Sequence, residues 1–368
     1  MRTSRLLTTV AVLLLMAVSA SAQRKIQVAL LLDTSNSMDG LIEQAKSQLW
    51  SIVNEMASAK AEGRSPEIEI ALYEYGNDGL SAEGNYIRQV VPLSKDLDKI
   101  SEALFALRTN GGNEYCGAVV SKSMKDLAWS PSNRDLKLIY IAGNEPFNQG
   151  GIDYKAACKS AIAKGIAINT IFCGDYDEGV RSFWKDGADL AEGKYFNINA
   201  NQATVYIETP YDKEINDLNG KLNTTYIGYG TLGEAKKANQ ATQDHNAAGY
   251  SPANAAERTV SKSSAAYRAD EWDLVDAVNN GTVKAAELKS EELPAELKGK
   301  SPEEIKAYVA KKTAERTEIQ KQIQDLSKKR TDYMAEELKK KGQDNSLNAA
   351  MAKALRERAE QLGFTFSK

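Results

Sequence analysis

One acid and two hydroxyls, Asp33, Ser35 and Ser37, are the residues of this sequence whose types and spacing best suit chemistry. They alternate along the chain, directly after the apolar run 26–32 and before a helical pattern that starts near Gly40. Oxygen donors placed in this way can converge on one hard cation, and Mg²⁺ prefers oxygen ligands while keeping positions open for water or another ligand. The run therefore predicts a binding site for Mg²⁺, or for Mn²⁺ or Ca²⁺.

A second loop with a hydroxyl lies further along the chain, between residues 108 and 114. It carries Thr109 and the pair Gly111-Gly112, and it falls between two amphipathic segments. Because glycine has no side chain, these positions allow close approach of another backbone. The pair lacks the Lys and the Ser or Thr of a phosphate-binding loop, so nucleotide binding is not predicted. Thr109 is the candidate for a further hydroxyl at the cation.

Alternating apolar runs and amphipathic stretches position these loops. The runs expected to form strands span residues 26–32, 68–75, 86–91, 136–142, 166–173 and 194–198. The stretches expected to form helices span residues 40–56, 97–107, 114–127, 153–164 and 180–191. Several runs are apolar on both faces, which is typical of parallel strands covered by helices on both sides. The pattern predicts an α/β fold with a doubly wound, mostly parallel six-stranded sheet and a C-terminal helical extension.

The order of the Asp33 loop and the Thr109 loop is similar to that of a von Willebrand factor type A domain, over roughly residues 26–200. Open α/β sheets bind ligands at the carboxyl ends of their strands, where this first loop lies. The resemblance implies a metal-ion-dependent adhesion site in which Ser35 and Ser37 coordinate Mg²⁺, and Asp33 contacts the ion directly or through water. It also implies that Thr109 adds its hydroxyl when a partner is bound, and that a carboxylate of this partner fills the open position.

The third part of the family's pattern is incomplete in this chain. Where such domains commonly have Thr-Asp-Gly, this sequence has Ala142-Gly143-Asn144, so a glycine replaces the acid. One anionic ligand fewer lowers the affinity for the cation, and a cation that is less neutralised attracts an acidic partner more strongly. Glu145, Asn144 and Glu114 are the candidates to supply the missing oxygen. The predicted metal site is Asp33, Ser35, Ser37, Thr109 and Glu145.

The first 22 residues are expected to be a signal peptide rather than part of the fold. Arg2 and Arg5 give a basic start, an apolar stretch covers residues 6–18, and small residues precede a cleavage point after Ala22. The apolar stretch is short for a membrane-spanning helix, and the combination is typical of a secretory signal. The sequence therefore predicts an exported protein, periplasmic or secreted, that is not an integral membrane protein, and the resemblance is to bacterial exported members of the family.

The chain becomes more polar after the predicted sheet domain, which covers residues 23–200. A polar helical or linker region is expected over residues 201–270, with a short helix at 212–222 and a polar helix plus loop at 232–266. A helical region follows over residues 271–368, with a short helix that starts at the apolar cluster near Trp272.

A long helix is expected within this last region. Ser301, Pro302 and Glu304 combine a capping box with a proline at the first helical position, and the helix is expected to run to residue 341. Its apolar stripe is interrupted by Arg330. The stripe fits either a coiled-coil seam or a hairpin in which the helix packs against residues 346–361.

Composition narrows the function classes. The net charge of −3 gives no support for nucleic-acid binding. Three cysteines, Cys116, Cys158 and Cys173, allow one disulfide in an oxidising compartment, or act as small buried residues. A nucleophilic cysteine requires a nearby His, and the one His, His245, lies in a distant polar region.

The preferred function is therefore an exported binding module that captures a carboxylate of a protein partner through a divalent cation. An alternative is a scaffold of the cell envelope that acts through its C-terminal helices, with an inert sheet domain. A Mg²⁺-assisted hydrolase is less favoured, because the sequence shows no second metal cluster and no paired nucleophile and base near Asp33. No enzymatic activity is predicted, and the oligomeric state is left open.

Overall fold

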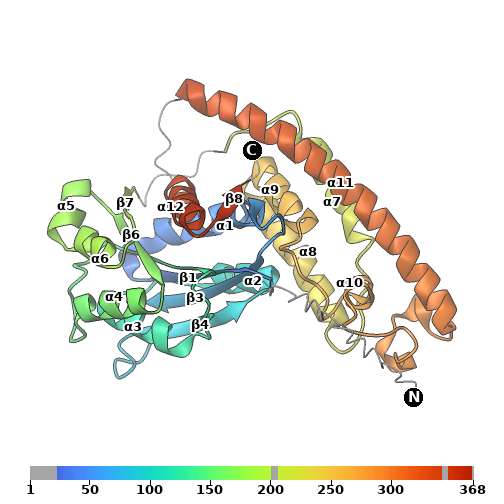
Figure 1. Cartoon of the computed structure of the whole chain (residues 1–368), viewed down its shortest axis with the longest axis horizontal. Coiled ribbons are helices and arrows are strands. Elements are labelled where there is room, and N and C mark those ends of the chain that lie inside the picture. Colours follow the sequence, from blue (N-terminus) through green and yellow to red (C-terminus); the bar gives the residue numbers. More distant parts are fainter. Residues whose placement is uncertain (1–22, 200–205, 342–346, 367–368) are drawn as a thin grey trace, which may run out of the picture.

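The N-terminal half of the chain is built on a six-stranded sheet (Figure 1). The computed structural model describes residues 23–199, 206–341 and 347–366, so the predicted signal peptide lies outside the described residues. The strand order is β4-β3-β1-β5-β6-β7. All neighbouring strands are parallel except β3 and β4. The strands are β1 (Lys25–Asp33), β3 (Glu67–Tyr75), β4 (Ile87–Ser94), β5 (Leu136–Gly143), β6 (Ala167–Cys173) and β7 (Tyr195–Ile198).

Helices cover both faces of this sheet, as the two-sided apolar runs predict. One face packs on α1 (Asp39–Ser58) and α2 (Leu97–Ala106), through side chains such as Val28 and Leu30 of β1. The other face packs on α3 (Cys116–Asp126), α4 (Tyr154–Ala163) and α6 (Trp184–Leu190). The predicted doubly wound, mostly parallel sheet is therefore confirmed, and its strands begin and end within three residues of the predicted positions.

One predicted helix is wrong in detail. The stretch 180–191 forms two short helices, α5 (Tyr176–Arg181) and α6, instead of one. Phe183 separates them in a left-handed conformation, with φ 71° and ψ 8°. A left-handed residue ends a helix because it turns the backbone out of the helical path. Periodicity alone does not reveal such a break, since Phe is rarely found at that position.

The region after the sheet domain is more regular than its polar sequence suggests. It contains α7 (Asp212–Asn223), α8 (Gly233–Tyr250), α9 (Pro252–Ser263) and α10 (Leu274–Asn279). The stretch expected as one polar helix plus loop is thus two helices, separated by Ser251, whose side chain caps α9. These helices dock on the sheet domain, because α9 packs against α1 and α8 packs against α2.

The long helix α11 (Pro302–Lys341) has the predicted bounds and lies along α7, α9 and α10 (Figure 1). Three-residue turns, η2 (Ser290–Glu292) and η3 (Ala295–Leu297), precede it. Its apolar stripe meets α7 and α9, and Arg330 completes that contact as a buried cation paired with Asp212 at 2.7 Å and with Glu257. The prediction of a coiled-coil seam or of a hairpin with residues 346–361 is therefore wrong.

Helix α12 (Leu347–Gln361) returns to the sheet domain instead (Figure 1). It packs against α1 and β5, and Leu355 belongs to the same buried cluster as Val28 of the first strand. Strand β8 (Phe364–Phe366) then pairs antiparallel with β2 (Ala59–Ala61), a two-stranded sheet that the sequence analysis did not predict. The last described elements thus complete one face of the N-terminal half.

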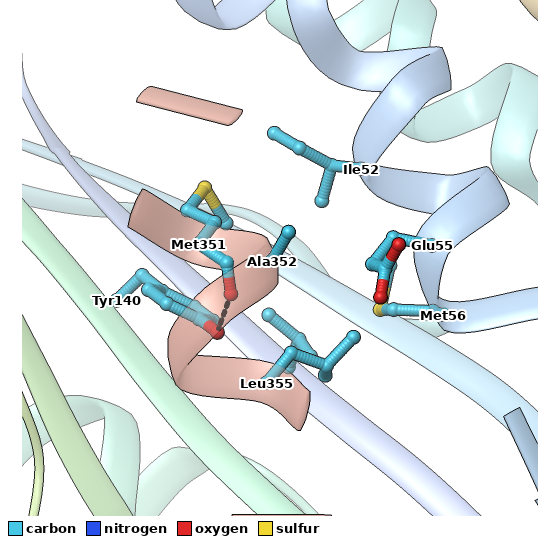
Figure 2. A pocket seen from close by; sticks show the side chains of 8 residues that line it. Ile52, Glu55, Met56, Tyr140, Met351, Ala352 and Leu355 are labelled. Atoms are coloured by element: carbon cyan, nitrogen blue, oxygen red, sulfur yellow. Dashed lines mark hydrogen bonds between the residues drawn. The ribbon is translucent and has the colours of Figure 1, made fainter. Parts of the chain in front are cut away.

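A small cavity lies beneath α12, between it, α1 and the sheet (Figure 2). The hydroxyl of Tyr140 donates a hydrogen bond to the backbone oxygen of Met351 at 2.9 Å beside it. The cavity is lined by Val28, Ile52, Glu55, Met56, Tyr140, Met351, Ala352 and Leu355. Because most of these side chains are apolar, the cavity reflects incomplete packing of α12 rather than a polar binding site.

None of the three cysteines forms a disulfide. Cys116 and Cys158 are buried free thiols, and Cys173 is partly buried. The interpretation as small buried residues therefore holds, and the disulfide that the sequence allows is not formed. Among the helices of the described ranges, none combines the length and the apolar character that crossing a bilayer requires.

Candidate metal centre

Three loops meet at the carboxyl end of the sheet. Asp33, Tyr75 and Gly143 end the neighbouring strands β1, β3 and β5. Backbone hydrogen bonds join the loops that follow, since the Thr34 N–H donates to Tyr75 at 2.9 Å and the Asn110 N–H donates to Thr34 at 2.9 Å. The sheet topology thus brings the two predicted site loops together, although they lie about 75 residues apart in the sequence.

The Asp33 loop has the arrangement expected of a cation site. Asp33 is 0% exposed, and its Oδ1 accepts a hydrogen bond from the backbone N–H of Ser35 at 2.7 Å. The hydroxyls of Ser35 and Ser37 lie 3.1 Å apart, so the alternate spacing does place both on one side of the loop. The other carboxylate oxygen of Asp33, Oδ2, is buried and has no hydrogen-bond partner within the described residues.

The remaining predicted residues surround this core. The Ser37 hydroxyl also contacts the Asn144 side chain, with an Nδ2–Oγ distance of 3.2 Å. The Thr109 hydroxyl hydrogen-bonds the Asp39 carboxylate at the start of α1. Glu145 has an exposed side chain, and its backbone oxygen accepts a hydrogen bond from the Trp184 indole at 2.8 Å. Thr109 and Glu145 therefore lie at the rim, and Asp33, Ser35 and Ser37 form the centre.

Glu114 is the carboxylate that reaches the centre. It is 4% exposed, and its carboxyl lies against the side chains of Asp33 and Ser35 and the backbone N–H of Glu145. Burial raises the pKa of Glu114. Burial, together with the neighbouring Glu114 carboxyl, raises the pKa of Asp33 well above its usual value. Two acids in contact and shielded from water resist being charged together.

This donor set fits a hard divalent cation. It offers two carboxyls and the hydroxyls of Ser35 and Ser37, and oxygen ligands of this kind suit Mg²⁺, Mn²⁺ or Ca²⁺. Nowhere in the described ranges do three or more His, Cys, Asp or Glu side chains gather around a possible metal position. A cation at this centre would therefore depend on the hydroxyls as well as on the two carboxyls.

The surroundings do not favour covalent catalysis. Cys116 lies nearby, with its sulfur 3.8 Å from the Tyr75 hydroxyl, but burial raises the pKa of this thiol well above its ordinary value. A protonated buried thiol is a poor nucleophile. Burial also raises the pKa of Cys158 to about 12.

Glu145 belongs to the predicted metal site, with Asn144 and Glu114 as alternatives for the missing oxygen, but Glu114 is the carboxylate that lies against Asp33. A signal was present in Gly76, which follows β3 and has φ 77°. A Cβ atom at this position would lie 2.6 Å from the Cγ of Glu114 and 2.9 Å from Oδ1 of Asp33. The glycine therefore leaves room for both acids. This role cannot be predicted from the sequence, because it depends on the positions of the loops in space.

Comparison with known proteins identifies the type of domain. The family model of the von Willebrand factor type A domain matches residues 27–220. A search of curated proteins finds no match to the sequence.

Several solved structures are similar to about half of this chain. One is the conserved hypothetical protein BatB from Bacteroides thetaiotaomicron, with 16% identity, coverage of 47% of this chain and 90% of that chain, and a TM-score of 0.36. Another is proximal thread matrix protein 1 of the mussel byssus, with 13% identity, coverage of 48% and 42%, and a TM-score of 0.36. A third is the pilus adhesin SpaC from Lactobacillus rhamnosus GG, with 13% identity, coverage of 48% and 28%, and a TM-score of 0.36. At these identities the similarity concerns the fold alone.

Proposed function

Because this chain belongs to the von Willebrand factor type A domain family, we propose that it is an exported protein-binding module with a cation-dependent site. Domains of this type are generally protein-interaction modules rather than enzymes. In this proposal a divalent cation, held by Asp33, Ser35 and Ser37, captures a carboxylate of a protein partner. Export rests on the basic start and apolar stretch of residues 1–22.

The observation that carries the proposal is the burial of the Asp33 carboxylate with one oxygen left without a partner in the described residues. Asp33 is fully buried, and its Oδ2 has no hydrogen-bond partner in the described part of the chain, which is costly because the charged form loses its hydration without compensation. A cation bound at Oδ2 would remove this cost. The Ser35 and Ser37 hydroxyls lie on the same loop and would add neutral oxygen ligands without adding charge.

The bound cation would supply a positive charge with a free coordination position for a partner's carboxylate. The chain's own residues would prepare that position. Asp33 orients the loop through its hydrogen bond with the backbone of Ser35, so that both serine hydroxyls stay together. Thr109 donates to Asp39 at the start of α1, and the lone pairs of its hydroxyl oxygen stay available to a cation at the rim of the centre.

A scaffold role for the C-terminal helices is the second candidate. It is favoured by α11, a helix of 40 residues that would span about 60 Å. Its outward side carries exposed charges such as Lys321, Lys328 and Lys329. Removing the C-terminal region would be a poor test, because α12 packs on β5 and its loss would uncover the sheet. Charge reversal of these three exposed lysines would test the scaffold role, because it should reduce partner binding by α11 while keeping the fold intact.

Affinity capture from the native envelope tests the proposed function directly. The full chain is used as bait in Mg²⁺ and in EDTA, and proteins enriched only in Mg²⁺ are identified. Ser37→Ala removes one exposed hydroxyl of the centre and is expected to abolish this enrichment. Ser182→Ala is the matched control, because its hydroxyl donates to the backbone of α5, away from the centre. Equal capture in EDTA, or equal capture by the Ser37→Ala bait, would contradict the cation-bridged mode.

A further inference from the structure

The position where the sequence lacks an acid cannot take one in the present packing. A Cβ atom on Gly143 would lie 2.6 Å from the hydroxyl of Tyr75 and 3.1 Å from Oδ2 of Asp33. The Tyr75 side chain is 0% exposed and donates to the backbone oxygen of Ala142 at 2.9 Å. The tyrosine hydroxyl thus occupies the space that a side chain at position 143 would need.

Glu114 approaches the same carboxylate from another direction. It precedes α3, and its backbone N–H donates to Oε1 of Gln149 at 2.9 Å, which fixes the start of that helix to the loop after β5. The glycine at position 76 leaves the space between Glu114 and Asp33 open, since a Cβ there would lie within 3 Å of both side chains. The two acids are therefore held in contact by the fold and not by chance side-chain rotation.

Asp33 and Glu114 differ from other buried acids of the chain in their lack of a basic partner within the described residues. Throughout the described ranges, neither Asp33 nor Glu114 forms an ion pair with a Lys or Arg. Other buried acids of the chain do have such partners, as Asp212 does with Arg330 at 2.7 Å. Either a proton or an external cation must offset two buried carboxyls in contact. The Oδ2 of Asp33 is buried and has no hydrogen-bond partner within the described residues, so one carboxylate oxygen of the pair is open to a cation.

We propose that Glu114 is a ligand of the metal centre and supplies, from the start of α3, the second carboxylate that position 143 lacks. The inference rests on the proposed function, since it requires that the Asp33 loop binds a cation. Glu145 has no direct role in this assignment. Gly76 leaves room for Glu114 beside Asp33, while the Tyr75 hydroxyl fills the space next to Gly143.

Mn²⁺ binding to the full chain tests this assignment, measured by the loss of the free-ion signal in electron paramagnetic resonance. Wild-type protein is expected to bind one Mn²⁺ that Mg²⁺ displaces. Glu114→Gln should weaken the affinity by about tenfold or more, because affinity in oxygen sites follows the number of charged ligands. Glu145→Gln makes the same change at the competing carboxylate of the rim, and it should weaken the Mn²⁺ affinity less than Glu114→Gln does.

A relocation experiment sharpens the test. In the Glu114→Gln background, Gly143→Asp alone should fail to restore affinity, because the Tyr75 hydroxyl fills the space. Adding Tyr75→Phe should restore part of it, since the ring stays and the obstructing oxygen leaves. Circular dichroism of each variant distinguishes misfolding from the loss of a metal ligand.

The outcomes separate the two proposals. Unchanged Mn²⁺ affinity in Glu114→Gln, with binding by the wild type, would overturn the role of Glu114 and leave the proposed function standing. A larger loss in Glu145→Gln than in Glu114→Gln would also overturn it. Absence of Mn²⁺ binding by the wild type would overturn both, and would indicate a shared proton between the two acids.

Discussion

Two regions of this protein bury acids, and they neutralise them in opposite ways. At the carboxyl end of the sheet, Asp33 and Glu114 lie together, and within the described part of the chain no basic side chain pairs with them. Between the sheet domain and the helices that follow, Asp98 and Asp244 are paired with Arg258 and Lys262. The difference separates two acids without a basic partner from acids that are paired with buried basic side chains.

The second region joins the two halves of the chain. Arg258 of α9 contacts Asp98 of α2 at 2.6 Å and Asp244 of α8 at 2.9 Å, and its guanidinium lies 4.3 Å from the ring centre of Trp50. Lys262 contacts Asp244 at 2.8 Å and is 0% exposed. These groups are buried with opposite charges in contact, so their charges offset one another, although Nη2 of Arg258 has no hydrogen-bond partner within the described residues.

The largest effect is expected from breaking the paired cluster. Asp244→Asn leaves Arg258 and Lys262 buried without their shared carboxylate, and should lower the free energy of unfolding by about 3–5 kcal/mol at pH 7. Denaturant titration measures this loss. A change below about 1 kcal/mol would show that the cluster tolerates an uncompensated charge, and would remove the contrast with the sheet site.

The same cluster predicts a pH dependence. Burial alone would raise the pKa of Asp244, but the charges of Arg258 and Lys262 outweigh it and hold the pKa well below its usual value. An acid with a lowered pKa contributes stability above its unfolded pKa of about 4, and this contribution is lost as the pH falls below that value. The difference between wild type and Asp244→Asn should therefore be full at pH 7 and shrink below pH 4. A difference that stays constant down to pH 2.5 would contradict this assignment.

A smaller effect is expected from filling the sheet site. Mg²⁺ at about 100 times its dissociation constant should raise the free energy of unfolding by about 2.7 kcal/mol, if it binds only the folded chain. Thermal unfolding in Mg²⁺ and in EDTA measures the shift. Asp244→Asn serves as the control, because it changes a distant acid and should retain the full Mg²⁺-dependent increase. The same shift in an Asp33→Asn variant would place the ion elsewhere.

The smallest expected change is an increase in the free energy of unfolding, whereas Asp244→Asn is expected to decrease it. In EDTA, Asp33→Asn should raise the free energy of unfolding by about 1–3 kcal/mol, because the amide removes an uncompensated buried charge and can donate to Glu114. The same substitution thus destabilises at position 244 and stabilises at position 33. Destabilisation at both positions would mean that Asp33 is satisfied within the protein, and the contrast between the two regions would fail.

Much of the sheet domain can be predicted from the sequence, because its strands are long, apolar on both faces and separated by regular helices. The Asp33 loop was predictable because it directly follows such a strand and because its oxygen donors are close in the sequence. The position of Glu114 beside Asp33 could not be predicted, because it depends on how the loops after β1, β3 and β5 approach one another. Gly76 and Tyr75 set that approach, and neither has a recognisable motif.

The helical half was harder to predict for a different reason. Arg258 and Lys262 lie in a polar stretch that suggests a solvated surface, and charged residues are rarely buried unless they are paired. One partner, Asp98, is distant in the sequence, and the other, Asp244, lies on the preceding helix α8, so the pairing depends on how α2, α8 and α9 pack. The apolar positions of α12 fit α11 or α1 equally well, so periodicity could not decide between a hairpin and a return to the sheet.

The most direct test of the central claim is a calorimetric titration of the full chain with Mg²⁺ at neutral pH, alongside Asp33→Asn. If the sheet site awaits an external cation, the wild type should bind one ion saturably and the variant should show no saturable binding. Equal binding by both proteins, or none by either, would contradict the claim that the buried acids of this site are completed by a metal.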